Sequence, residues 1–195
     1  MQAGVDFTIR QLLPSDRIKS FSAGDSSAQP LKTFLQKQAQ HFHGAHIAKT
    51  WVAVKLQAQE NGTLAEEAQA AVLGYITLIC SEISLRNAYA IEDCPTANQY
   101  EYMPALKIAR LAVDSRYRSQ GIGDQLLALA IAIGTDLIAP YIGCRFIITD
   151  AKKGAIRFYQ KFGFTLLESE QEQDAPAMFL DILQLPEANQ VKPTK

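Results

Sequence analysis

The amino-acid sequence predicts an α/β fold with a mixed central sheet and helices on both faces. Its first half reads as strand, helix and two paired strands, and its second half alternates strand–helix–strand–helix–strand. Such alternation is typical of a sheet that is covered by helices. A chain of 195 residues with 48% hydrophobic content can bury one core of ordinary size without disulfides. We therefore expect one domain over residues 1–185 and a disordered tail over residues 186–195.

The first half contains one expected helix between expected strands. Residues 5–13 suit an opening strand, and a Gly/Ser-rich loop follows at residues 22–30. A helix is expected over residues 31–42, ending near Gly44, because the apolar residues recur at roughly helical spacing. Two strands are then expected at residues 50–57 and 71–80, joined by a long or partly helical connection.

Proline and glycine residues divide the second half. Residues 81–103 read as a loop with a short excursion, with Pro95 and Pro104 as breakers. A central strand is expected at residues 106–113, followed by a long apolar helix at residues 123–139 that Pro140 closes. The last expected elements are a buried strand at 145–149, a short helix at 155–162 stopped by Gly163, and strands at 164–168 and 177–183.

The overall composition is typical of a soluble intracellular protein. The net charge is −1 and the isoelectric point is about 6.3, so bulk charge indicates neither nucleic-acid nor membrane binding. Three widely spaced cysteines without a C-x-x-C pair argue against a disulfide framework or a zinc site. The most apolar stretch, residues 126–133, is too short to span a bilayer, and the N-terminus does not resemble a signal peptide. We expect a cytoplasmic protein that does not bind membranes.

The most informative stretch is residues 111–124, where a strand ends, a basic turn follows and two glycines open a helix. Gly121 and Gly123 let the backbone come close to a bound group, and the first helical turn leaves several N–H donors free. With the helix dipole, these donors form an anion site that suits a pyrophosphate. The pattern Arg118-x-x-Gly121-x-Gly123 is neither a Walker loop nor a Rossmann fingerprint.

A second motif lies about thirty residues further along the chain. It reads Asp150-Ala…Ala155-x-x-Phe158-Tyr159-x-x-Phe162-Gly163-Phe164. The two motifs in this order resemble the acetyl-CoA motif and partner helix of the GNAT superfamily of N-acetyltransferases, over most of residues 105–165. The resemblance implies the GNAT fold, an acetyl-CoA co-substrate, no metal ion and transfer of an acetyl group to an amine.

The resemblance also implies a role for individual residues. The backbone of Leu111, Ala112 and Val113 would hold the acetyl and pantetheine amides by sheet-like hydrogen bonds. Tyr159 would protonate the departing CoA thiolate, although it shares a helical face with Ala155 and Phe162 and could equally be a core tyrosine. The pyrophosphate would be cradled by seven consecutive residues: Arg118, Ser119, Gln120, Gly121, Ile122, Gly123 and Asp124.

The acceptor amine can be narrowed from its acid–base chemistry. No carboxylate occurs at residues 106–113, where some lysine-acetylating relatives place a general base. At pH 7, roughly a tenth of the molecules of an α-amine with a pKa of about 8 are neutral. For a lysine side chain the neutral fraction is about one part in a thousand or less. The missing base therefore favours a low-pKa amine, with Glu82, Glu101 and Asp114 as candidates to act as a base through water.

A longer resemblance concerns the acceptor. Residues 21–24, 30–39, 74–78 and 104–113 resemble the GNAT toxins of bacterial toxin–antitoxin pairs, which acetylate the α-amine of aminoacyl-tRNA. This resemblance implies an aminoacyl-tRNA substrate, a ribbon–helix–helix antitoxin and a homodimer. Basic residues are concentrated between Lys107 and Lys161, where they could neutralise CoA phosphates, form an ordinary solvated face or line a polyanion path.

Three alternatives remain open from the sequence. The chain could acetylate a small amine or a protein N-terminus, or it could be a non-catalytic domain that binds CoA or a partner.

The histidines His41, His43 and His46 are expected to interact with the C-terminal end of a helix rather than with a metal ion, because Gly44 interrupts the helix there. Cys144, next to a buried strand, is expected to be a core thiol.

Overall fold

The structure is a computed structural model that describes residues 1–58, 64–66, 70–85, 88–167 and 173–185. The chain forms two compact units, which are considered separately. The first unit comprises Met1–Ile79 and Ala109–Ala130, and the second comprises Cys80–Ile108 and the chain from Ile131 onward. The disorder expected for residues 186–195 falls outside the described residues. Within the described part, no helix is both long and apolar enough to cross a membrane.

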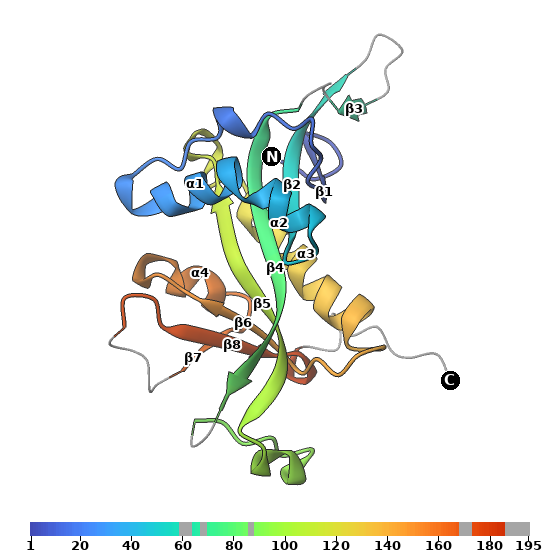
Figure 1. The fold of residues 1–195 in the computed structure, drawn as a ribbon, viewed down its shortest axis with the longest axis vertical. Coiled ribbons are helices and arrows are strands. Elements are labelled where there is room, and N and C mark those ends of the chain that lie inside the picture. The colour runs from blue at the N-terminus through green and yellow to red at the C-terminus, as the bar shows by residue number, and fades with distance from the viewer. Residues whose placement is uncertain (59–63, 67–69, 86–87, 168–172, 186–195) are drawn as a thin grey trace. The chain divides into compact units, whose positions relative to one another are not determined.

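The secondary structure follows the expected order (Figure 1). The strands are β1 (Phe7–Gln11), β2 (Lys49–Ala58), β3 (Leu64–Glu66), β4 (Val72–Ser84), β5 (Tyr102–Val113), β6 (Phe146–Asp150), β7 (Thr165–Leu166) and β8 (Ala177–Asp181). The α-helices are α1 (Gln29–Lys37), α2 (Ala39–Gly44), α3 (Ile122–Ala132) and α4 (Ile156–Gln160). Short 3-10 turns lie between them, and a π-helix, Ile133–Ile138, continues α3.

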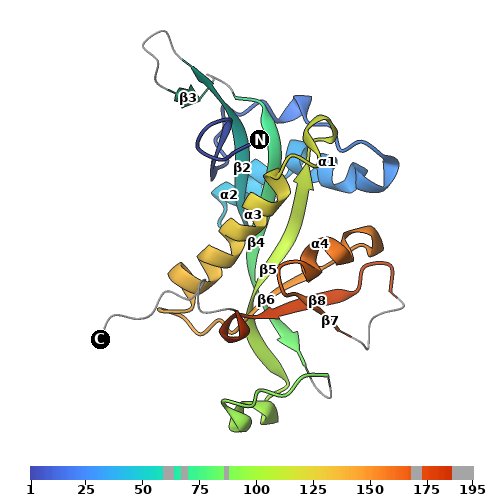
Figure 2. The ribbon, with the colours of Figure 1, turned by 180° about the vertical axis from the view of Figure 1, so that it is seen from behind.

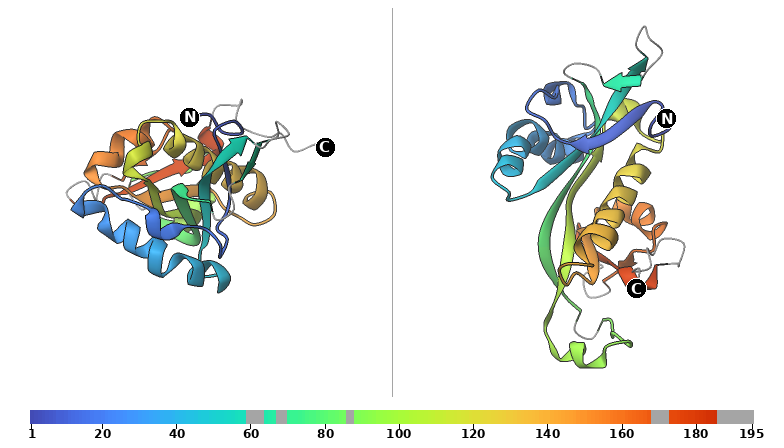
Figure 3. Two further views of the ribbon diagram at one scale, coloured as in Figure 1. Left: turned by 90° about the horizontal axis from the view of Figure 1, so that it is seen from above. Right: turned by 90° about the vertical axis from the view of Figure 1, so that its right-hand side faces the viewer.

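In the first unit, the strands are ordered β1-β2-β4-β5, with β3 paired to β2. Strand β2 is antiparallel to each of its partners, β1, β3 and β4. Helices α1 and α2 cover one face of these strands and α3 covers the other (Figures 1 and 2). The side view in Figure 3 shows the same two layers of helices. The prediction that helices cover both faces of the sheet is confirmed.

The core of the first unit lies between the sheet and α1. Phe21, Phe34 and Tyr75 are at most 2% exposed, and their rings contact one another. The hydroxyl of Tyr75 donates to the carbonyl of Leu31 at 2.7 Å, which satisfies its only donor inside the core. On the other face, a Cβ at Gly74 would lie 2.9 Å from Ile122, so glycine is needed for α3 to approach the strand.

In the second unit, the strands are ordered β4-β5-β6-β8-β7. Strand β6 is parallel to β5 and antiparallel to β8. The β5–β6 register runs from Ala105↔Phe146 to Ile108↔Thr149, which makes the sheet mixed. Tyr89, Phe146 and Phe179 form a cluster of edge-to-face aromatic rings in the core.

Several predicted elements differ in detail. The single helix expected at residues 31–42 is two helices, because the backbone leaves helical angles at Gln38 (φ −124°, ψ −33°). The connection expected to be long or partly helical contains β3 instead, because residues 64–66 pair with the end of β2. Strand β4 continues to Ser84 and strand β5 already begins at Tyr102, so both strands include residues that were expected to lie in the loop.

The long helix expected at residues 123–139 changes character at Ile133. Ala139 N–H donates to Gly134 C=O, five residues back, which is the π-helical pattern. The hydroxyl of Thr135 donates to the carbonyl of Ile131 at 3.1 Å and so competes for an acceptor of the regular helix.

Pro104, which was expected to break the chain's regular structure, lies inside β5. Its carbonyl still accepts from Arg145 N–H at 3.1 Å.

One ion-pair network ties the connection between β4 and β5 to the sheet of the second unit. The guanidinium of Arg145 donates to Asp93 through both Nη atoms, at 2.8 and 2.7 Å, and to Asp181 through Nε and Nη2, at 2.6 and 2.8 Å. Asp181 is only 4% exposed and also accepts from the hydroxyl of Tyr89 at 2.8 Å. These bonds raise the pKa of the Arg145 guanidinium.

Replacement of Arg145 by leucine should lower the free energy of unfolding by about 3 kcal/mol, because it leaves the buried Asp181 carboxylate without its counter-charge. Urea unfolding measures the change. Arg157→Leu removes the same charge from an exposed position of α4 and should alter stability by less than about 0.5 kcal/mol. Equal effects of the two substitutions would contradict the structural role of the network.

Candidate active site

The predicted phosphate cradle lies in the first unit, where β5 leads into α3. The backbone turns through the 3-10 helix Ser115–Tyr117 and then passes Ser119 and Gly121 with positive φ, +61° and +80°. Helix α3 begins at Ile122 directly after this turn. The left-handed angle at Gly121 is one that side chains disfavour, so the glycine predicted from the motif has a structural reason.

The backbone of Gly121 is half-buried and has little packed against it. A Cβ at Gly121 would meet only the backbone carbonyl oxygen of Met1, at 3.8 Å. The first turn of α3 has N–H groups without intrahelical acceptors, and these groups and the helix dipole favour an anion. The local geometry therefore fits a pyrophosphate, the group that acetyl-CoA would place here.

The remaining predicted cradle residues are of two kinds. Ile122 is 1% exposed, so its side chain anchors the start of α3 in the core and only its backbone is available to a ligand. Leu111, Ala112 and Val113 are half-buried at the end of β5. The other residues of the motif are exposed or half-buried: Arg118, Ser119, Gln120, Gly123 and Asp124.

Asp114, a candidate base, has a structural role instead. Its side chain is 0% exposed, and it accepts from the Arg116 guanidinium at 2.9 and 2.7 Å and from Ser22 N–H at 2.9 Å. Burial would raise the pKa of this carboxyl, but the hydrogen bonds from Arg116 and Ser22 outweigh it and hold the pKa low. A carboxylate that is fully engaged in this way is poorly placed to accept a proton through water.

Tyr159 lies in the second unit, on α4, and is 6% exposed. Its ring contacts Phe158 and Phe164 at 5.2 and 5.4 Å, so it packs as a core residue. Burial raises the pKa of its phenol, while a hydrogen bond with the Thr149 hydroxyl acts in the opposite direction. The hydroxyl of Tyr159 therefore lies within hydrogen-bonding reach of the Thr149 hydroxyl. The role of Tyr159 as an acid stays a prediction from the motif.

Thr149 was not singled out by sequence reasoning. It is 3% exposed and occupies the last register pair of β5 and β6, where its hydroxyl donates to Ile108 C=O at 3.1 Å. The sequence signal was a threonine in an otherwise apolar buried strand. Just beyond it, Asp150 forms an ion pair of 2.6 Å with Lys107, which connects the same two strands.

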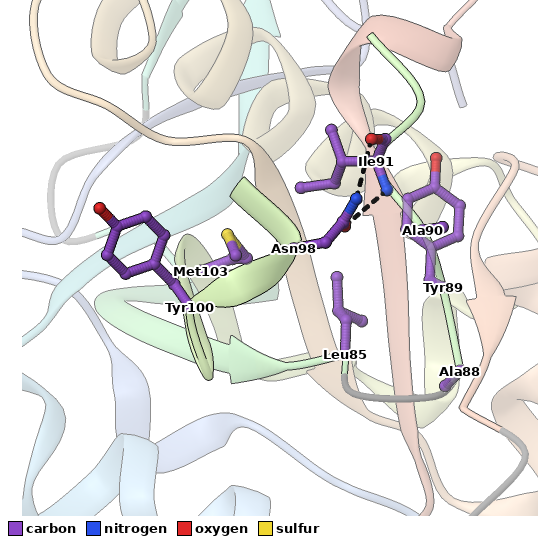
Figure 4. Close-up of a pocket in the computed structure, with 8 residues that line it drawn as sticks. All are labelled: Leu85, Ala88, Tyr89, Ala90, Ile91, Asn98, Tyr100 and Met103. Atoms are coloured by element: carbon purple, nitrogen blue, oxygen red, sulfur yellow. Dashed lines mark hydrogen bonds between the residues drawn. The ribbon is translucent and has the colours of Figure 1, made fainter. Parts of the chain in front are cut away.

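A cavity of about 490 Å³ lies in the second unit, within the connection that was expected to be an irregular loop (Figure 4). Its wall is braced by Asn98, whose side-chain amide donates to Ile91 C=O at 3.1 Å and accepts from Ile91 N–H at 2.9 Å. The lining residues are Leu85, Ala88, Tyr89, Ala90, Ile91, Asn98, Tyr100 and Met103. None of the predicted site residues lines this cavity.

The histidines and cysteines have ordinary structural surroundings. His43 accepts a hydrogen bond from Thr50 N–H at 3.1 Å through Nδ1, at the end of α2. Among the residues that the structure describes, no three His, Cys, Asp or Glu side chains are grouped as metal ligands. Cys144 is buried, as expected for a core thiol, whereas Cys80 and Cys94 are exposed.

The fold is that of an acyltransferase of the GNAT class. Residues 50–166, more than half of the chain, match the family model described as "Acetyltransferase (GNAT) domain". The chain therefore belongs to the GNAT acetyltransferase family, and it is an N-acetyltransferase with acetyl-CoA as donor.

Solved structures of bacterial toxins share this fold. A tyrosine-to-phenylalanine variant of KacT matches with a TM-score of 0.75 and 22% identity over 91% of this chain and 96% of that chain. AtaT in complex with acetyl-methionyl-tRNAfMet matches with a TM-score of 0.73 and 23% identity, over 90% and 95% of the two chains. AtaTR bound with acetyl-CoA gives a TM-score of 0.71 and 23% identity, over 91% and 95%. At these identities the likeness establishes the fold.

Gly121→Asp should weaken acetyl-CoA binding by about tenfold or more, because it places a negative charge and a strained side chain at the predicted pyrophosphate position. Calorimetric titration measures the Kd, and a thermal melt shows whether the variant is folded. Gly143→Asp adds the same charge where a Cβ would meet nothing within 4 Å, and it should bind acetyl-CoA normally. An unaltered Kd for Gly121→Asp would remove the cradle assignment.

Proposed function

We propose that this enzyme acetylates the α-amine of aminoacyl-tRNA and thereby blocks translation. The observation that carries the proposal is the likeness, over nine-tenths of the chain, to AtaT solved with acetyl-methionyl-tRNAfMet. That complex holds an aminoacyl-tRNA whose amine carries an acetyl group, which is the product this reaction would release. The chain would act in the cytoplasm, where its substrate is charged.

The donor would be bound chiefly by backbone groups. Leu111, Ala112 and Val113 end β5 with strand-like angles, and their N–H and C=O groups can pair with the pantetheine amides as another strand would. The turn at residues 118–124 would receive the pyrophosphate at the start of α3. When bound, acetyl-CoA supplies the activated acyl carbon.

The transfer itself needs one nucleophile and one acid. The neutral amine attacks the acetyl carbonyl carbon, the new C–N bond forms, and the C–S bond to CoA breaks. We propose that Tyr159 gives its proton to the departing sulfur, while the amine loses its proton to solvent. The phenolate left behind would lie at a buried position beside the Thr149 hydroxyl, whose own proton is donated to Ile108 C=O in the structure.

An α-amine next to an ester fits a site without a strong base. Such an amine has a pKa near or below about 8 and is partly neutral at pH 7. Strand β5 offers no carboxylate over residues 106–113, and the carboxylate of Asp114 is already paired with Arg116. A lysine acceptor would need to be deprotonated first, so these residues favour the aminoacyl group.

The basic residues of the chain divide into paired and exposed groups. Lys107, Arg116 and Arg145 form ion pairs within the protein, and Arg110 lies over the ring of Phe34 at 4.0 Å. Three of the exposed basic residues recur at intervals of four along the turn before α4 and along α4 itself: Lys153, Arg157 and Lys161. We propose that this basic stripe contacts the tRNA backbone.

The same comparisons support a proposal for the partners of this chain. Structures are known of KacTA with DNA and of AtaT with the C-terminus of the antitoxin AtaR. We propose that this chain likewise pairs with a small antitoxin of the ribbon–helix–helix type, and that it forms a homodimer.

Tyr159→Phe should reduce kcat at least about a hundredfold, in the range expected for loss of a general acid, and leave the Kd for acetyl-CoA unchanged. Because burial raises the pKa of Tyr159, the phenol stays protonated at neutral pH. Acid-dependent turnover of the unchanged enzyme should therefore persist until the pH exceeds the ordinary tyrosine value of about 10. Steady-state rates across pH measure both effects, and undiminished turnover of the variant would remove the acid assignment.

Labelled acetyl groups should pass from acetyl-CoA to bulk aminoacyl-tRNA and not to the same tRNA after deacylation. Acid-precipitable label measures transfer to the two pools. Replacement of the basic stripe residues Lys153, Arg157 and Lys161 by Glu should weaken this transfer. The same replacement should leave the Kd for acetyl-CoA unchanged. Label on small amines or protein N-termini, with none on charged tRNA, would assign the enzyme to another acceptor.

A further inference from the structure

A short segment near the N-terminus is bound tightly to the turn that follows β5. This segment, residues 21–25, is named the early loop. Two of its side chains, Phe21 and Ala23, are at most 2% exposed and anchor it in the core of the first unit. Between them, Ser22 N–H donates to Asp114 at 2.9 Å, and Ser22 C=O accepts from Ser115 N–H at 2.8 Å. The early loop is therefore fixed at both its side chains and its backbone.

The early loop also holds the side chain of Arg118, the first residue of the glycine motif. Nη2 of Arg118 donates to Ala23 C=O, and Nη1 lies 3.8 Å from the carboxylate of Asp25. The guanidinium rests on Gly24, where a Cβ would lie 3.2 Å from Nη2 and 3.4 Å from Cζ. The same Cβ would lie 3.2 Å from the Cβ of Ser115. Gly24 also has a φ of +87°, an angle that favours glycine, so any side chain here would displace Arg118, Ser115 or the backbone.

These contacts leave much of the guanidinium free for an anion. Arginine carries five N–H donors in a rigid fork, and the early loop engages only part of them. The side chain of Arg118 is 48% exposed, so the rest can face a ligand. An arginine that is already oriented loses less side-chain entropy when it binds phosphate.

We propose that the early loop is part of the acetyl-CoA site, with Ala23 and Gly24 as positioning residues that orient the Arg118 guanidinium for the CoA phosphates. This inference rests on the cradle assigned above to residues 118–124. It gives a role to a segment, Phe21-Ser-Ala-Gly24, that sequence reasoning used only as a mark of resemblance. Because Gly24 contacts the Arg118 guanidinium, a change at Gly24 is expected to alter binding of the CoA phosphates and not the acyl transfer itself.

The test compares two glycines with the same unusual backbone angle. Gly24→Ala places a Cβ against the Arg118 guanidinium and the Cβ of Ser115, whereas Gly4→Ala, at φ +79°, places one in open space. Gly24→Ala should weaken acetyl-CoA by about tenfold, the loss expected for one hydrogen bond to a charged group, and Gly4→Ala should not. Calorimetry gives the Kd, and thermal melts control for backbone strain in both variants.

A donor without phosphates separates positioning from a general disturbance of the site. With acetyl-pantetheine, which lacks the pyrophosphate, Gly24→Ala should turn over at the rate of the unchanged enzyme. The pair should also be non-additive: Gly24→Ala should weaken acetyl-CoA no further in a chain that already carries Arg118→Ala.

Additive losses, or an equal loss with acetyl-pantetheine, would overturn the inference and make Gly24 a folding residue only. The cradle itself is tested independently by Gly121→Asp. Weak binding by that variant with normal binding by Gly24→Ala would leave the cradle in place and reject only the role of the early loop. Normal binding by both variants would reject the cradle as well.

Discussion

The carboxylate of Asp114 is the constraint on which the first unit depends. A charged group with 0% exposure must be matched by donors, since an unmatched one would cost several kcal/mol. The donors come from two places in the sequence, Ser22 in the early loop and Arg116 in the turn itself. The same Arg116 guanidinium reaches the carbonyl of Ser20 at 2.9 Å. Satisfying one carboxylate thus determines where β5 ends, how the chain turns and where the early loop lies.

The second unit also contains a buried aspartate that is paired with an arginine, but here the arginine precedes the aspartate in the sequence. Here Asp181, at the end of β8, is the buried carboxylate, and Arg145 bridges it to Asp93 in the connection between β4 and β5. In each unit, an Arg–Asp pair fixes an irregular segment that ordinary strand pairing would leave unspecified. The cradle in the first unit and the walls of the cavity in the second are both such segments. Irregular backbone is where binding sites are usually built, and it needs this support to keep one shape.

The parts of the fold that were predictable are those set by local patterns. Strands β2, β5 and β6 and the start of α3 follow from apolar periodicity and from Gly121, because each depends on residues close in sequence. The break at Gln38, the strand β3 and the extension of β4 to Ser84 depend on pairing and packing with distant residues, which periodicity does not contain. The roles of Asp114 and of the early loop were missed for the same reason, since Ser22 and Asp114 are separated by 92 positions.

The small number of titratable groups near the proposed chemistry has a physical explanation. A thioester is already an activated acyl donor, and a thiol of pKa about 8.5 is a fair leaving group, so the enzyme has to supply little acid strength. An amine that is partly neutral at pH 7 makes a dedicated base unnecessary. What remains is to hold a long, negatively charged donor in register. Backbone N–H groups at the end of a strand and the start of a helix suit this task, and in the proposed site the Arg118 guanidinium adds a positive charge beside them. The proposed acid, Tyr159, packs as a core residue, and the burial that raises the pKa of its phenol also keeps the proton in place until the thiolate departs.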